Sequence, residues 1–262
     1  DSAPLKEGGE RLVVRARPLE GQPETPDELG FSENLRVRIR ELTSQRQGVV
    51  LTCGLPNSGV TTLAFGVIRS IDAYLYSIFS LANFGGRSLV HITSPEPVAG
   101  EDFELALARC IRSEGDVIIV DPLNTQERLN VVFDAADKVC IVSEYKAKDA
   151  AHGIQSLTQS LEPAIVADRL KLILSQKLIR TLCRKCKDAY RPNPKLMEKV
   201  GLPPETKVLY RPPRINEEGE EPEFCQHCGG IGYYGRTGLI EAIEVNEAIK
   251  ELILNGADPK AI

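Results

Sequence analysis

Residues 49–62 read Val49-Val50-Leu51-Thr52-Cys53-Gly54-Leu55-Pro56-Asn57-Ser58-Gly59-Val60-Thr61-Thr62. The first five predict a buried strand, and the apolar spacing that continues through Leu63, Val67 and Ile71 predicts a helix. Between them lies the pattern G-x-x-x-x-G-x-T. In such a unit the loop N–H groups and the positive end of the helix dipole face one anion. We therefore predict a phosphate loop, with an ordinary strand-to-helix turn as the alternative. Its nucleotide-binding residues would be Gly54, Asn57, Ser58, Gly59, Val60, Thr61 and Thr62.

Val60 departs from the phosphate-loop pattern, which has lysine at this position. That lysine is the mobile positive charge that reaches the outer phosphates during transfer. Losing one preorganised transition-state donor commonly costs about 10²–10³ in rate. Thr61 keeps the hydroxyl that would hold Mg²⁺. The expected ligand is ATP or ADP with magnesium, held by a loop that has lost hydrolytic chemistry.

The pattern around the loop predicts an α/β fold. A helix is expected between Ser32, its N-cap, and Gly48, because Leu35, Ile39 and Leu42 recur at helical spacing. Short apolar runs alternate with helical patterns, which is typical of a parallel sheet covered by helices on both faces. The runs are 89–93, 117–120 and 139–142, and the helical patterns are 103–112, 125–135 and 149–161. After residue 162 we expect an apolar stretch, part helix and part strand, that leads to the cysteines, and at 246–254 a short helix.

Four of the seven cysteines form two C-x-x-C pairs, which are Cys183/Cys186 and Cys225/Cys228. Two chelating thiolate pairs suit a tetrahedral, structural zinc ion. The alternatives are two buried cysteine pairs or a redox C-x-x-C, for which no thioredoxin-like context is present. His227 lies inside the second pair, but four sulfurs already complete a closed site.

Composition limits the class of protein. The chain of 262 residues is 42% hydrophobic and 26% charged, with a formal net charge of −5. These values exclude collagen, coiled coil and wholesale disorder, and they give no global basic field for nucleic acid. No apolar run approaches the roughly 18 residues of a membrane span. The low cysteine content fits a reducing, cytoplasmic setting. The chain starts at Asp1 without Met, so we expect a fragment of a longer protein, with residues 1–30 as a linker and remnant of an N-terminal domain.

The chain resembles the C-terminal ATPase domain of the type II secretion and type IV pilus assembly ATPases, over nearly its whole length. Residues 176–183 (QKLIRTLC) and 232–241 (GYYGRTGLIE) carry the resemblance best, with support from 9–15 and 28–32. It implies a RecA-like P-loop core at 31–178, a tetracysteine zinc module at 179–235 and a helical tail at 236–262. It also implies that Arg15 contacts nucleotide and that Arg112 matches a family arginine.

The resemblance also implies that the family's hydrolytic apparatus is degenerate in this chain. The catalytic acidic pair falls on Thr93 and Ser94, with Glu96 nearby but out of register. The family's Gly-Glu falls on Asp121-Pro122, so its glutamate is absent. The motif histidine is replaced by Lys146, and one family arginine by Ala108. Little transition-state stabilisation would then remain beyond backbone amides.

These observations predict a pseudo-ATPase that acts as a structural or nucleotide-sensing subunit. By resemblance, it would form a ring with itself or with active relatives, at the cytoplasmic face of the inner membrane beside a platform protein. One alternative is a weakly active ATPase that uses Asp121 or Glu96. The other is a zinc-dependent nucleic-acid-binding protein, suggested by the basic run at 169–191, although few aromatics interleave that run and the whole chain is acidic.

Overall fold

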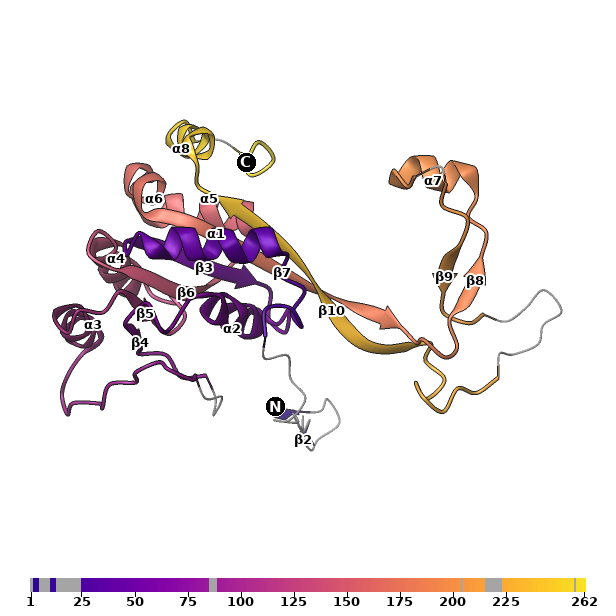
Figure 1. Ribbon diagram of the computed structural model, residues 1–262, viewed down its shortest axis with the longest axis horizontal. Coiled ribbons are helices and arrows are strands. Elements are labelled where there is room, and N and C mark those ends of the chain that lie inside the picture. Colours follow the sequence, from indigo (N-terminus) through magenta and orange to yellow (C-terminus); the bar gives the residue numbers. More distant parts are fainter. Residues whose placement is uncertain are drawn as a thin grey trace.

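A computed structural model of the chain describes residues 2–4, 10–12, 25–84, 89–203, 205–214, 223–256 and 258–262. Its centre is a six-stranded sheet with helices on both faces (Figure 1). The sheet order is β10-β7-β3-β6-β5-β4. The strands are β3 (Gly48–Gly54), β4 (Ile78–Ser80), β5 (Val117–Ile119), β6 (Cys140–Lys146), β7 (Leu170–Leu182) and β10 (Tyr233–Glu244). Neighbouring strands run parallel except for β10, which pairs antiparallel with β7. The predicted mixed α/β fold with a parallel sheet is confirmed.

Two apolar clusters, one on each face of the sheet, form the core. Alternate residues of β3 enter different clusters, Val49 and Leu51 on one side and Val50 on the other, as the period-two geometry of a strand requires. On the Val50 side pack α1 (Glu33–Ser44) and α2 (Val60–Ser70). On the Leu51 side pack α3 (Phe103–Arg112), α4 (Gln126–Ala135), α5 (Ala150–Ser160), α6 (Pro163–Arg169) and α8 (Glu247–Leu254).

Side-chain caps fix the starts of several helices. The side chain of Ser32 accepts a hydrogen bond from the N–H of Leu35, as predicted, and Asp102, Thr125 and Asp149 cap α3, α4 and α5 in the same way. The helices expected at 103–112, 125–135 and 149–161 are therefore present with nearly the predicted bounds. The strands expected at 49–53, 117–120 and 139–142 are β3, β5 and β6.

The strand predicted at 89–93 is wrong. Within the described residues, this stretch contributes only an isolated bridge between Thr93 and Phe79, and the edge strand is β4, earlier in the chain. His91 has a φ of 61°, which interrupts an extended backbone. Ile78 is buried and pairs with Val117, so the sheet is completed by a segment that the sequence did not mark as a strand.

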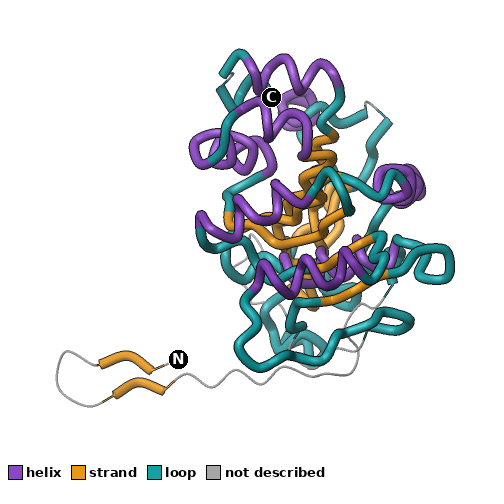
Figure 2. The backbone as a smooth tube through the Cα atoms, turned by 90° about the vertical axis from the view of Figure 1, so that its left-hand side faces the viewer, coloured by secondary structure: helices purple, strands orange, loops and turns teal. Residues whose placement is uncertain are grey.

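β7 and β10 continue beyond the core as a two-stranded ribbon (Figure 1). At its far end lie the four cysteines and a small unit made of β8 (Asp188–Tyr190), α7 (Pro194–Val200) and β9 (Leu209–Arg211). A separate antiparallel pair joins β1 (Ser2–Pro4) to β2 (Glu10–Leu12), drawn beside the N-terminus in Figure 2.

Candidate functional site

The predicted phosphate loop lies between the carboxyl end of β3 and the start of α2. Asn57 and Gly59 have φ values of 66° and 84°, so the chain curls tightly before the helix. Gly59 is the N-cap of α2 and makes no side-chain cap. Within the described residues, no acceptor pairs with the backbone N–H groups of 59–62. These N–H groups are therefore open to an anion at the positive end of the helix dipole.

Close packing inside the loop explains the first glycine. A Cβ on Gly54 would lie 2.4 Å from Ser58 Oγ and 2.9 Å from a Val60 methyl carbon. Ser58 Oγ is itself buried and has no hydrogen-bond partner among the described residues. A buried hydroxyl without a partner is costly, and a phosphate oxygen would satisfy it. The loop thus offers hydrogen-bond donors that a phosphate group could use.

The Gln176 side chain holds the loop through two hydrogen bonds to its backbone carbonyls, and sequence reasoning missed this role. Its side chain is only 3% exposed, and its Nε2 donates to Ser58 O at 2.9 Å and to Gly59 O at 3.3 Å. Gln176 lies on β7, more than a hundred residues along the chain. The resemblance over 176–183 was the only signal that could have drawn attention to it.

Glu144 is the second residue that sequence reasoning missed. It lies near the carboxyl end of β6, and its Oε2 accepts a hydrogen bond from Thr61 Oγ1 at 3.3 Å. Burial raises the pKa of the Glu144 carboxyl, the Thr61 hydrogen bond opposes this, and the Asp121 charge adds to it. Its position two residues after the predicted apolar run at 139–142 was the available sequence signal.

The other acidic candidates have contacts elsewhere. Asp121 Oδ1 accepts the N–H of Asn83 at 3.0 Å, and its Oδ2 lies 3.9 Å from an Arg128 nitrogen. Glu96 is exposed, and its backbone carbonyl accepts a hydrogen bond from the Arg109 guanidinium at 3.2 Å. The structure brings together the predicted residues of the loop, from Gly54 to Thr62. Arg15 lies outside the described residues.

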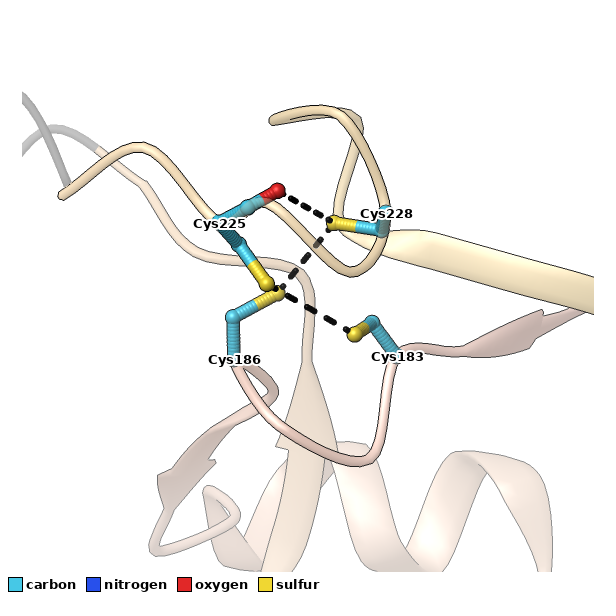
Figure 3. A group of neighbouring side chains, drawn as sticks. All are labelled: Cys183, Cys186, Cys225 and Cys228. Carbon is cyan, nitrogen blue, oxygen red and sulfur yellow. Dashed lines mark hydrogen bonds between the residues drawn. The ribbon is translucent and has the colours of Figure 1, made fainter.

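The four predicted cysteine ligands converge from two chain segments at the end of the ribbon (Figure 3). Their Sγ atoms all lie within 4.8 Å of one another. Cys183 Sγ is 4.0 Å from Cys225 Sγ, and Cys186 Sγ is 3.6 Å from Cys228 Sγ. Sulfurs bound tetrahedrally to zinc at about 2.3 Å stand about 3.8 Å apart. The cluster therefore has the dimensions of a tetrahedral metal site.

Local backbone structure prepares the second cysteine pair. Gly229, Gly230 and Gly232 all have positive φ values, so the chain wraps around the sulfurs. The Gly232 N–H donates to Cys228 Sγ at 3.3 Å. Backbone N–H groups of Cys228 and His227 lower the pKa of the Cys225 thiol to about 7, whereas desolvation and the neighbouring thiols raise the pKa of Cys186 to about 12. The His227 ring instead stacks on Tyr234, with centroids 4.2 Å apart.

The described fold and loop define a mixed α/β protein built like the solved secretion ATPases. The crystal structure of the pilus retraction motor PilT with bound ADP aligns with a TM-score of 0.54 at 17% identity, covering 97% of this chain and 66% of that one. A likeness at this identity supports the fold. Among the described residues, no helix has the length and hydrophobicity to cross a bilayer.

The chain belongs to the type II/IV secretion system protein family, whose model matches residues 2–262. It is 27% identical over 253 residues to the type IV pilus assembly ATPase PilB of Thermus thermophilus, and 25% identical over 252 residues to the type II secretion system protein E of Dickeya dadantii. Each match covers 95% of this chain, but 28% and 48% of those proteins respectively. The family expected from the sequence is confirmed, and the chain spans half or less of these relatives' length.

Proposed function

We propose that this chain is a nucleotide-binding, non-hydrolysing subunit of a type II secretion or type IV pilus assembly. The observation that carries the proposal is the loop at 54–62, which keeps open N–H groups at the start of α2 but has valine in place of lysine. Backbone N–H groups can bind a phosphate, but they do not supply the mobile positive charge that a lysine side chain brings to the outer phosphates during phosphoryl transfer. The chain would thus act as a nucleotide sensor and as a structural component of the assembly.

The arrangement of carboxylates supports binding without hydrolysis. Thr61 and Glu144 would hold Mg²⁺, which screens phosphate charge when bound. The family's glutamate position is Pro122, and the neighbouring Asp121 is engaged by Asn83 and Arg128. Proline has no carboxylate, and Asp121 already binds other groups, which supports binding of nucleotide without general-base activation of a water molecule.

The cysteine cluster is proposed to hold a structural zinc ion. Its four sulfurs supply all the ligands of a tetrahedral site and leave no open position for catalysis. Two of the ligands follow the end of β7 and two precede the start of β10, so zinc would fix these ends of the two strands together and support the unit of β8, α7 and β9.

The organisation and setting follow from family membership. We propose a core at 31–178, a zinc module at 179–235 and a tail at 236–262, after a linker and N-terminal remnant at 1–30. β7 and β10 run unbroken across the inner boundaries, so the modules would share strands. The assembly would be a ring of this chain, alone or with active relatives, at the cytoplasmic face of the inner membrane beside a platform protein.

Calorimetry with ADP and with a non-hydrolysable ATP analogue, each with Mg²⁺, tests the proposal. We expect sub-millimolar binding and no steady-state phosphate release above background. The variant Val60→Lys is the matched gain-of-charge control and should bind both ligands more tightly, because it restores a phosphate-directed ammonium. No binding by the parent would contradict a nucleotide role and leave a purely architectural subunit.

A slow ATPase is a second candidate, favoured by the Glu144 carboxylate at the Thr61 hydroxyl. In this case phosphate release would depend on that carboxylate. Activity that falls in Glu144→Gln but not in the exposed-site control Glu96→Gln would support it. Activity equal in the parent and both variants would identify a contaminating enzyme.

A further inference from the structure

The end of β6 contributes a lysine beside the phosphate loop. Cys140 and Val142 point into the cluster under α1 and α2, and Glu144, two residues further on, contacts Thr61 on the same side. Because side chains alternate along a strand, Lys146 continues this row. In the parallel pairing of β3 with β6, Lys146 lies opposite Gly54, the first residue of the loop.

The loop lacks the charge that a lysine would supply. Val60 is apolar, and Glu144 places a carboxylate against Thr61. A nucleotide phosphate therefore needs positive charge from another element. Adjacent strands stand about 4.8 Å apart, so the Lys146 backbone is next to Gly54. The flexible four-carbon side chain of Lys146 is long enough to extend across the loop.

Lys146 is available for this task. Its side chain is exposed and forms no ion pair or hydrogen bond with the described residues. An ammonium has three donors and no acceptor, and so it matches a phosphate oxygen cluster. By contrast, Arg128 and Arg109, on α4 and α3, are paired with Asp121 and Glu101.

We propose that the Lys146 ammonium binds the outer phosphate of the nucleotide and replaces the missing loop lysine from the neighbouring strand. This inference rests on the proposed nucleotide-binding function. The ammonium and a magnesium ion held by Thr61 and Glu144 would lie on the same open side of the loop. Together they would neutralise the negative charge of the phosphates, which the backbone N–H groups stabilise only in part.

The test is calorimetric titration of the full chain with ADP and Mg²⁺, comparing the parent with Lys146→Met, Lys146→Arg and the control Lys148→Met. Lys148 is an exposed lysine two residues further along the chain, after β6 has ended. Losing one charged hydrogen bond to phosphate should weaken binding about 10- to 100-fold in Lys146→Met. Lys146→Arg should retain most of the affinity, and Lys148→Met should match the parent. Thermal unfolding without nucleotide should be the same for all four proteins.

The double variant Val60→Lys with Lys146→Met tests the replacement directly. If the two positions supply the same charge, the lysine at position 60 restores the affinity that Lys146→Met removes. Equal binding by the parent and Lys146→Met would overturn the inference and leave the proposed function standing. A loss that Val60→Lys does not restore would also overturn it, since Lys146 would then act in another way. Silence of the parent protein would instead refute the proposed function.

Discussion

Replacing Gly59 by alanine should lower the free energy of unfolding by an amount that can be worked out from the contacts of this glycine. Gly59 has a φ of 84°, and a Cβ there would lie 2.6 Å from Gln176 Nε2. The left-handed backbone costs an alanine about 1–2 kcal/mol. Pushing the Gln176 amide away removes its bonds to Ser58 O and Gly59 O, at about 0.5–1.5 kcal/mol each. We expect Gly59→Ala to lower the free energy of unfolding by about 2–5 kcal/mol in total, by adding these ranges.

Gly30 provides the matched control. Its φ is 80°, and among the described residues other than its two chain neighbours no heavy atom lies within 4 Å of the position of an added Cβ. Gly30→Ala should cost only the backbone part, about 1–2 kcal/mol. Urea denaturation of both variants measures the difference. In a Gln176→Ala background, Gly59→Ala should also cost only the backbone part, since the obstructing amide is gone. Equal costs for the two glycines, or no relief in that background, would refute the packing argument.

Three further outcomes are expected. Cys225→Ser, or treatment of the parent with a chelator, should release bound zinc. Amide hydrogen exchange should then rise in the cysteine module but not in β3. Equal protection of the module with and without the metal would contradict a metal role. Glu144→Gln should stabilise the protein at neutral pH, because the raised pKa of Glu144 means that its ionised form is costly in the folded state. This gain should shrink as the pH falls through the raised pKa and be absent below the ordinary carboxyl pKa. A gain that stays constant down to acid pH in a urea series would exclude this cause. Arg38→Ala should lower the free energy of unfolding by about 1 kcal/mol or less at neutral pH, because Arg38 Nε donates to Glu244 Oε2 at 2.6 Å in a partly exposed pair. The Arg38 hydrogen bond lowers the pKa of Glu244, so this cost should shrink as acid protonates Glu244. A cost that stays the same in acid would show that the pair does not stabilise the fold.

Local patterns carried most of the fold. Helices with an apolar stripe and a capping side chain, such as α3 behind Asp102 and α5 behind Asp149, were predicted with nearly their final bounds. The edge strand was not, because Ile78–Ser80 is only three residues long and owes its conformation to pairing with β5. An apolar run alone predicted 89–93, where His91 adopts a left-handed conformation instead.

The candidate site divides in the same way. The loop at 54–62 and the cysteine pairs are contiguous motifs, so their residues could be named from spacing. The roles of Gln176 and Glu144 depend on which strands lie beside β3 and on the register of the pairing. Lys146 was read from the sequence as the replacement of a histidine, and its place opposite Gly54 emerged only from the same register. Distant pairing leaves little trace in a single sequence, which is why these residues were missed or incompletely interpreted.

β7 carries Gln176 at the phosphate loop and reaches Cys183 seven residues later without an intervening loop. This distance is about 23 Å of extended chain at about 3.3 Å per residue. The loop at 54–62 and the cysteine cluster are therefore joined by one continuous strand, which pairs with β10 from Leu172 to Leu182. Two regions with no direct contact thus share a single hydrogen-bonded element.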